Sequence, residues 1–183
     1  MKYAGIREEE LKNKVAQEYF WQYDCTKIIG NVDFCVSIRH SGGELFEQES
    51  LMWAEAKSDI YKSLVQLILT IGKSRTFDRH LPPPFLGAFD AEHIAFIPYN
   101  DIHDIFYQND FNWNVTPSNH DTKEFKLVLD KVKSIIERNA LLYSYETDEK
   151  ELHKFIKANF IVGKFGITKI KIDKNNFMVI YNK

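Results

Sequence analysis

The amino-acid sequence predicts an α/β fold, with helices packed on a sheet, because segments at helical spacing alternate with segments of strand composition. Residues 5–22 carry apolar side chains at the spacing of an amphipathic helix, and residues 60–73 are apolar nearly all round, as in a buried helix. β-Branched and aromatic residues dominate the stretches between and after these two helices. The predicted order is one helix, three strands, a buried helix and two further strands.

Composition and charge limit the class of protein. The chain has 183 residues, 44% of them hydrophobic and 14% aromatic, which is typical of a folded domain and excludes a disordered chain. The net charge of -2 gives no general attraction to nucleic acid, so such binding requires a local basic patch. Two cysteines are too few for a disulfide framework. The first residues lack the apolar run of a signal peptide and no segment reads as a membrane span, so we expect a cytoplasmic protein without a membrane partner.

The segments on either side of the buried helix are predicted to form one sheet. Residues 26–40 and 50–57 have the composition of a hairpin or meander, with Ser41-Gly42-Gly43 near its tip. Gly72 is placed to end the buried helix. Two more strands are expected at residues 84–89 and 93–98, separated by a turn at 90–92.

The second half of the chain is predicted to be mainly helical. The expected elements are a short helix at 100–108, helices at 121–143 and 148–160, and a closing hairpin at 166–182. Asp121 and Glu124 stand in capping-box positions at the start of the first long helix. We therefore expect a core domain at residues 1–118 and a helical and hairpin extension at residues 119–183 that leads to a further domain of a longer protein.

Glu55 and Lys57 form the first candidate for chemistry. On a strand, residues two apart point to the same face, so Trp53, Glu55 and Lys57 project together, while Met52, Ala54 and Ala56 face the other way. An acid and a base then share one side of the strand. A plain surface ion pair gives the same pattern.

Asp33 is the second candidate. Val32, Phe34 and Val36 are expected on one face of their strand, which leaves Asp33 on the other face. If this strand pairs with residues 50–57, Asp33 can lie beside Glu55, and two adjacent carboxylates repel each other unless a cation such as Mg²⁺ holds them. A cross-strand ion pair between Asp33 and Lys57 is the structural alternative.

The two predicted helices add polar residues that face inward. Lys62, Gln66, Thr70 and Lys73 form one polar stripe on the otherwise apolar helix, which indicates either a wet site or a solvent-exposed seam. On the first helix, three consecutive glutamates point in different directions at 100° per residue, and Glu8 is the one that projects with the apolar side chains. Glu8 is therefore either a further metal ligand or a group stabilised by the helix dipole.

Asp33, Glu55-Ala56-Lys57 and Gln66, in this order through helix, strands, helix and strands, resemble the PD-(D/E)xK nuclease fold of many restriction endonucleases. The runs KIIGNVDFCVS, LMWAEAK, VQLILTIGK and NDFNWNVTPS also resemble the N-terminal nuclease region of fused restriction-modification proteins that carry an N6-adenine methyltransferase. The likeness extends over roughly residues 5–118. It departs from the family pattern at Val32, where a proline precedes the aspartate in the family. The resemblance implies a restriction-endonuclease-like mixed central sheet flanked by helices.

The resemblance also implies roles for the candidate residues. Asp33 and Glu55 would bind Mg²⁺, or Mn²⁺ in its place, with the Ala56 carbonyl, and Glu8 would be an additional ligand. Lys57 would orient or deprotonate the attacking water, with a pKa lowered beside the metal ion. Gln66 would steady the site or contact a phosphate.

The implied function is that of a metal-dependent DNA endonuclease domain in a restriction-modification enzyme. Lys62, Lys73 and Arg75 lie along or just past the polar stripe and would contact the backbone of double-stranded DNA, although each alone is also ordinary surface charge. Methyltransferase and target-recognition domains would lie elsewhere in the full-length chain, and a transient dimer would supply the two active sites of a double-strand cut. The alternative is an inactive nuclease-like module that docks DNA or a partner domain.

Overall fold

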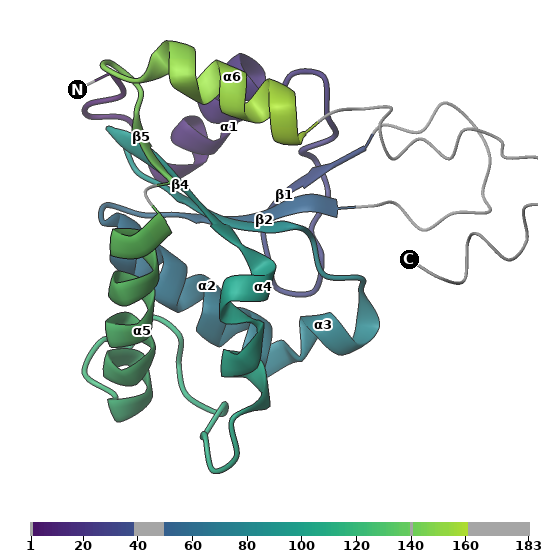
Figure 1. Ribbon diagram of the computed structural model, residues 1–183, viewed down its shortest axis with the longest axis vertical. Helices are drawn as coiled ribbons and strands as arrows, with labels where there is room; N and C mark the ends of the chain where they lie inside the picture. The colour runs from purple at the N-terminus through teal and green to yellow at the C-terminus, as the bar shows by residue number, and fades with distance from the viewer. Residues whose placement is uncertain (1, 39–49, 140, 161–183) are drawn as a thin grey trace, which may run out of the picture.

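The computed structural model describes residues 2–38, 50–139 and 141–160, which form a five-stranded mixed sheet between two layers of helices (Figure 1). This arrangement confirms the predicted α/β class. The predicted turn at Ser41-Gly42-Gly43 and the predicted hairpin at 166–182 lie outside the described residues. Within the described part of the chain, no helix is long and apolar enough to cross a membrane.

The elements follow the predicted order in part, but Leu142 and Tyr143, which were predicted to end the helix at 121–143, belong to a strand. The helices are α1 (Glu8–Tyr19), α2 (Ile60–Ser74), α3 (Thr76–Arg79), α4 (Tyr99–Ile102), the 3-10 helix η1 (His103–Tyr107), α5 (Lys123–Asn139) and α6 (Glu149–Asn159). The strands are β1 (Phe34–Ser37), β2 (Ser50–Ala56), β3 (Phe85–Phe89), β4 (His93–Pro98) and β5 (Leu142–Ser144).

The strands lie in the order β1-β2-β3-β4-β5. Only β2 and β3 are parallel, and the other three neighbouring pairs are antiparallel. A parallel pair needs a crossover connection, and α2 provides it between the end of β2 and the start of β3. The end of β2 and the start of α2 are thereby brought close together, which matters for the candidate site.

Both faces of the sheet are buried, because α1 and α6 cover one face and α2, α4 and α5 cover the other (Figure 1). Trp53 packs in the hydrophobic core on the α2 side, whereas Met52, Ala54 and Ala56 pack in the core on the α1 side. This confirms the predicted assignment of the side chains of β2 to its two faces. It also means that a polar group on β2 is not on an open strand surface.

Residues 123–160 share the same two cores as the first part of the chain. Phe125 and Val128 of α5 pack with α2, while Leu152 and Ile156 of α6 pack with α1. Strand β5 pairs with β4 and extends the sheet. The predicted domain boundary at residue 118 therefore does not coincide with a break in either core.

Two details before β2 differ from the sequence prediction. Instead of three strands before α2, the described residues contain two, because residues 29–32 close a tight turn in which the backbone N–H groups and carbonyls of Ile29 and Val32 bond each other. Gly30 has a φ of 59° within this turn. Val32 therefore packs in the α2 core, and the prediction that it shares a face with Phe34 and Val36 is wrong.

The predicted helix boundaries also need correction at two positions. Gly72 lies inside α2, which ends at Ser74 with Arg75 as its left-handed cap. A Cβ atom at Gly72 would lie 2.0 Å from the Trp113 ring, so the glycine serves packing rather than helix termination. At the start of α5, the hydroxyl of Thr122 accepts the bond from the Phe125 N–H, in place of the predicted capping box beginning at Asp121.

Candidate functional site

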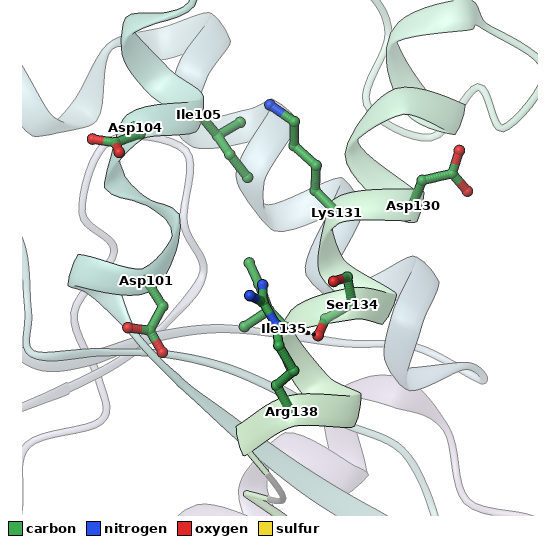
Figure 2. Close-up of a pocket in the computed structure, with 8 residues that line it drawn as sticks. All are labelled: Asp101, Asp104, Ile105, Asp130, Lys131, Ser134, Ile135 and Arg138. Carbon is green, nitrogen blue, oxygen red and sulfur yellow. Dashed lines mark hydrogen bonds between the residues drawn. The ribbon is translucent and has the colours of Figure 1, made fainter.

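A surface pocket of about 400 Å³ lies between α4 with η1 on one side and α5 on the other (Figure 2). Its lining combines carboxylates with two cations: Asp101, Asp104, Ile105, Asp130, Lys131, Ser134, Ile135 and Arg138. None of these residues belongs to the set predicted from the sequence. The predicted residues gather instead at the end of β2.

Asp33 and Glu55 lie next to one end of the β1–β2 ladder. Phe34 pairs with Ala54 and Cys35 with Trp53 in this antiparallel ladder, so Asp33 directly precedes the first paired residue of β1 and Glu55 directly follows its partner on β2. The Asp33 charge also acts on the Glu55 carboxyl and favours its neutral form. The strand containing residues 34–37 thus pairs with β2, as the sequence analysis required for Asp33 to lie near Glu55.

Glu55 is buried, and its side chain is only 9% exposed. Its Oε1 lies 3.1 Å from the Lys57 Nζ. Lys57 in turn donates to both carboxylate oxygens of Glu8, at 3.0 and 2.9 Å. Glu55 and Lys57 thus form a partly buried contact between β2 and the start of α1, rather than an exposed surface pair.

Asp33 does not pair with Lys57, so that alternative is wrong for this structure. The Asp33 Oδ2 accepts a bond of 2.7 Å from Lys12 Nζ. The same ammonium group lies 2.9 Å from Glu9 Oε1 and 3.1 Å from Glu8 Oε1. Lys12 is the central cation of the site, and the sequence analysis missed it.

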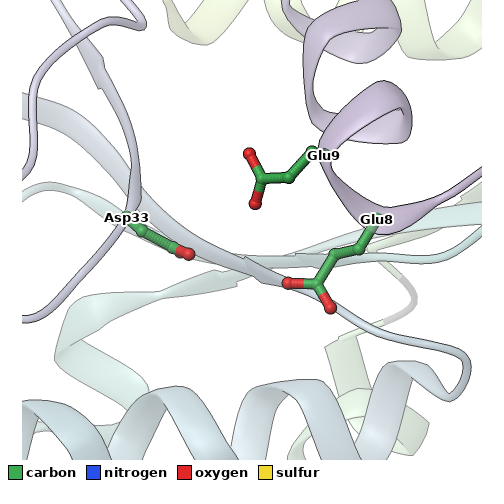
Figure 3. A group of neighbouring side chains, drawn as sticks. All are labelled: Glu8, Glu9 and Asp33. Atoms are coloured by element: carbon green, nitrogen blue, oxygen red, sulfur yellow. The ribbon is translucent and has the colours of Figure 1, made fainter.

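Glu8, Glu9 and Asp33, here called the carboxylate cluster, direct their carboxyl groups toward a common space between the start of α1 and the segment before β1 (Figure 3). One oxygen atom from each lies within 4.8 Å of the others. These are hard oxygen donors of the kind that Mg²⁺ and Mn²⁺ prefer. The donor chemistry of the carboxylate cluster fits a divalent cation, and Glu55 is not one of its three members.

The three consecutive glutamates differ in exposure and partners. Glu8 reaches Lys57 just beyond the end of β2, whereas the Glu10 side chain is 55% exposed and, among the described residues, meets only Lys14 on the same helix, at 3.8 Å. The Glu9 side chain is 81% exposed and contacts Lys12. The selection of Glu8 as the inward glutamate is confirmed, and Glu9 is an addition to the predicted set.

Burial and ion pairing shift the pKa values of the site in different directions. Burial would raise the pKa of Glu8, but the bonds from Lys57 and Lys12 outweigh it and lower that pKa. Burial raises the pKa of Glu55, and the contact with Lys57 offsets only part of this rise. Burial would lower the pKa values of Lys12 and Lys57, but their carboxylate partners raise both. With these protein partners alone, Lys57 holds its proton.

In the part of the chain that the structure describes, the side chains of Gln66 and Ala56 form no hydrogen bond or ion pair with the other candidate residues. Gln66 is half-buried on α2 and has no hydrogen-bond partner among the described residues, so it does not join Asp33, Glu55 or Lys57. Ala56 is the buried last residue of β2 and pairs with Phe89. Its position at the strand end next to Lys57 is compatible with the predicted role of its carbonyl.

The three predicted DNA contacts are spread along α2. Lys62 is exposed in the first turn of α2. Lys73 and Arg75 lie at the far end of the helix, about 17 Å or more along the axis from Lys62. There, Lys73 donates to the Val115 carbonyl at 3.0 Å, and Arg75 bonds Asp78 and stacks on Phe77. The three cations therefore do not form one patch.

Lys12 could have been found from its spacing. It follows Glu8 by four residues and Glu9 by three, the separations at which oppositely charged side chains meet on a helix. It also falls between Leu11 and Val15 on the buried stripe of α1. A lysine on a buried stripe requires acidic partners, and Asp33 is one of them.

No protein family matches the chain, and comparisons with curated proteins and with solved structures found no match either. The function is therefore inferred from the side chains and their arrangement.

Proposed function

We propose that the chain is a metal-dependent DNA endonuclease domain that hydrolyses phosphodiester bonds with an activated water, within a restriction-modification enzyme of restriction-endonuclease-like fold. The observation that supports it most is that Glu55 and Lys57 contact each other at 3.1 Å at the end of β2, while Asp33 directly precedes the strand that pairs with β2. Three residues chosen for their order along the sequence thus lie near one strand end. If the Glu-x-Lys pattern were accidental, there would be no reason to expect an aspartate next to the neighbouring strand at the same end of the ladder.

The proposed roles follow from the positions of the side chains. Asp33, Glu55 and Glu8 hold a Mg²⁺ or Mn²⁺ ion, with the Ala56 carbonyl as a further donor. When bound, the ion supplies positive charge that stabilises the negative charge developing on the phosphate. Lys57 orients the attacking water, and its own orientation is fixed by Glu8 and Glu55. Gln66 contacts the substrate rather than the other site residues.

A non-catalytic docking module is the second candidate, and one observation favours it. Two ammonium groups, from Lys12 and Lys57, already bind the carboxylates, so the site is stabilised without a metal ion. Such a module would keep the fold to hold DNA or a partner domain. It predicts that Asp33 and Lys57 can be replaced without loss of function.

Incubation of the purified chain with supercoiled plasmid and Mg²⁺ or Mn²⁺ tests the proposal. The wild type is expected to nick or cut the plasmid, and Lys57→Ala is expected to lose at least about 100-fold in rate. Lys14→Ala is the matched control, because Lys14 is an exposed lysine of α1 whose one ion pair within the described residues is with Glu10. Its rate should equal that of the wild type.

The other outcomes separate the two candidates. Equal cleavage by the wild type and Lys57→Ala would remove the proposed role of Lys57. Inactivity of the wild type, with Mn²⁺ binding that Asp33→Ala abolishes, would assign the missing step to the proposed target-recognition domain. Inactivity without Mn²⁺ binding would favour the docking module.

A further inference from the structure

The Lys12 side chain is 7% exposed and ends among three carboxylates. We propose that the Lys12 ammonium group is a resident counter-ion of the proposed metal site, which holds the carboxylate cluster together and which a divalent cation must displace. This inference rests on the proposed function, because it concerns the same site. It assigns to Lys12 the regulation of metal binding, not a contact with the substrate.

The geometry gives Lys12 the position of a bound cation. Its Nζ lies 2.7 Å from Asp33, 2.9 Å from Glu9 and 3.1 Å from Glu8, and these three residues come from two separate segments of the chain. An ammonium group has three donor hydrogens, and the three carboxylates match that number. Lys12 therefore does for the cluster what a metal ion would do, but with one positive charge instead of two.

Both cations cannot occupy this space together. A divalent ion coordinates carboxylate oxygens at about 2.0–2.6 Å, depending on the ion. The ammonium group is within bonding distance of the oxygens of Glu8 and Asp33 that such an ion would use. The two cations would also repel each other strongly at this separation. Metal binding therefore requires Lys12 to leave the cluster.

Lys12 has a route out of the cluster, whereas Lys57 has reason to stay. Four flexible carbons carry the Lys12 ammonium, and its partner Glu9 is mostly exposed, so rotation beside Glu9 brings the charge to water. Lys57 instead contacts Glu8 and Glu55, whereas Asp33 pairs with Lys12. A metal ion bound by Asp33 would therefore exchange for Lys12, and Lys57 would keep its contact with Glu55.

Chemical labelling of amines in the wild-type chain tests the exchange without any substitution. Lys12 should react slowly with an acylating reagent in metal-free buffer, and more rapidly after addition of Mn²⁺, as measured by peptide mass spectrometry. Lys14, whose side chain is 46% exposed on the same helix, is the control and should react equally in both conditions. Unchanged labelling of Lys12 at Mn²⁺ concentrations that saturate the site would overturn the inference.

Mn²⁺ titration of Lys12→Met, with Lys14→Met as the matched control, gives a second readout. If the ammonium group occupies the cluster about nine-tenths of the time, its removal tightens the apparent affinity for Mn²⁺ about 10-fold. The metal-free variant should also melt at a lower temperature, and Mn²⁺ should restore more of its stability than of the wild type's. Lys12→Gln serves the same purpose if the methionine variant does not fold.

The outcomes distinguish this inference from the proposed function. Mn²⁺ binding that needs Asp33 but is equal or weaker in both Lys12 variants would overturn the inference and leave the metal site intact. Absence of Mn²⁺ binding in the wild type and in both Lys12 variants would overturn the inference together with the metal-dependent function.

Discussion

Helix α1 has an ion-paired cluster at each end, and the two clusters differ in how fully their carboxylates are used. At the C-terminal end, one oxygen of Glu18 is bonded by Lys2 and the other by the hydroxyl of Tyr3. At the N-terminal end, Asp33 and Glu9 each contact Lys12 through a single oxygen. Both oxygens of Glu8 are bonded by Lys57, so among the described residues only Asp33 and Glu9 of the second cluster have an oxygen without a bonded cation.

The surroundings of the two ends agree with this difference. Tyr3 and Tyr19 pack on the ring of Tyr145 at centroid distances of 5.0 and 5.5 Å, so aromatic side chains order the C-terminal cluster. The carboxylate cluster joins α1 to the segment before β1, at the end of a parallel strand pair. We therefore expect the C-terminal cluster to contribute mainly to stability, and the carboxylate cluster to carry the proposed metal binding.

The largest expected difference between the two ends is in metal binding and cleavage. Asp33→Asn should reduce plasmid cleavage at least about 100-fold, because it removes the charge that holds the ion. Glu18→Gln should leave cleavage within about 2-fold of the wild type, since it changes only the C-terminal cluster. Rates at saturating Mn²⁺ provide the comparison, and similar losses in both variants would show that the ends do not differ in function.

Glu18→Gln should lower the thermal stability, although it is expected to leave cleavage nearly unchanged. Burial would raise the pKa of Glu18, but its bonds from Lys2 and Tyr3 lower it, so the ionised form stabilises the fold above the pKa of the unfolded chain, about 4.3. Glu18→Gln should cost about 1 kcal/mol at pH 7, because the 35% exposure of the side chain allows solvent screening. Calorimetric melting should show a fall of about 2–4 °C. An unchanged melting temperature would mean that the C-terminal cluster is not a stabilising one.

Glu55 and Glu8 should respond to pH in opposite directions. Burial raises the pKa of Glu55, so the folded protein prefers its neutral form, and the stability this gives is present below the unfolded pKa of about 4.3 and lost as pH rises through the folded value. The lowered pKa of Glu8 gives stability that is present above about 4.3 and lost as pH falls.

The two glutamine variants test these signs. Glu55→Gln should melt slightly higher than the wild type at pH 7, by about 2 °C, while losing cleavage, and Glu8→Gln should melt lower. The difference for Glu55→Gln should shrink as the pH falls toward about 4.3, because the buried carboxyl of the wild type then becomes neutral. The difference for Glu8→Gln should shrink only below about 4.3, because its lowered pKa keeps the Glu8 carboxyl ionised to lower pH. A lower melting temperature for Glu55→Gln at pH 7 would contradict the inference that the folded protein prefers the neutral form of Glu55.

The sequence was sufficient to predict the parts of the fold that depend on local periodicity. The two faces of β2 follow from the period of two, and the inward direction of Glu8 follows from the period of 3.6. The position of Gly72 does not follow from such patterns. Its lack of a Cβ makes room for Trp113, which is far away in the sequence, so a helix-ending glycine and a packing glycine look the same in one dimension.

The candidate site was also predictable only where it depends on local periodicity and strand pairing. Asp33, Glu55 and Lys57 could be grouped because neighbouring strands pair in register. The burial of Lys12 was not predicted, because a lysine on a helix is usually exposed and only the tertiary approach of Asp33 supplies its third partner. Gln66 was predicted from a polar stripe on α2 that the structure confirms. Such a stripe indicates the direction in which the Gln66 side chain points, but it does not identify the group that the side chain binds.

Replacement of Glu10 should have the smallest effect on stability and Mn²⁺ affinity. It therefore tests whether the position of Glu8 on α1, and not its charge alone, determines metal binding. Glu10 is the third of the consecutive glutamates, and its only ion pair in the described chain is the exposed contact of 3.8 Å with Lys14. Glu10→Gln should therefore change stability by no more than about 0.5 kcal/mol and leave Mn²⁺ affinity unchanged, although it removes the same charge two residues from Glu8. If Glu10→Gln weakened Mn²⁺ binding as much as Glu8→Gln, the effect of Glu8 would come from the general negative charge of the helix start and not from its position in the site. Equal titrations of Glu10→Gln and the wild type would instead assign the effect of Glu8 to the direction of its side chain.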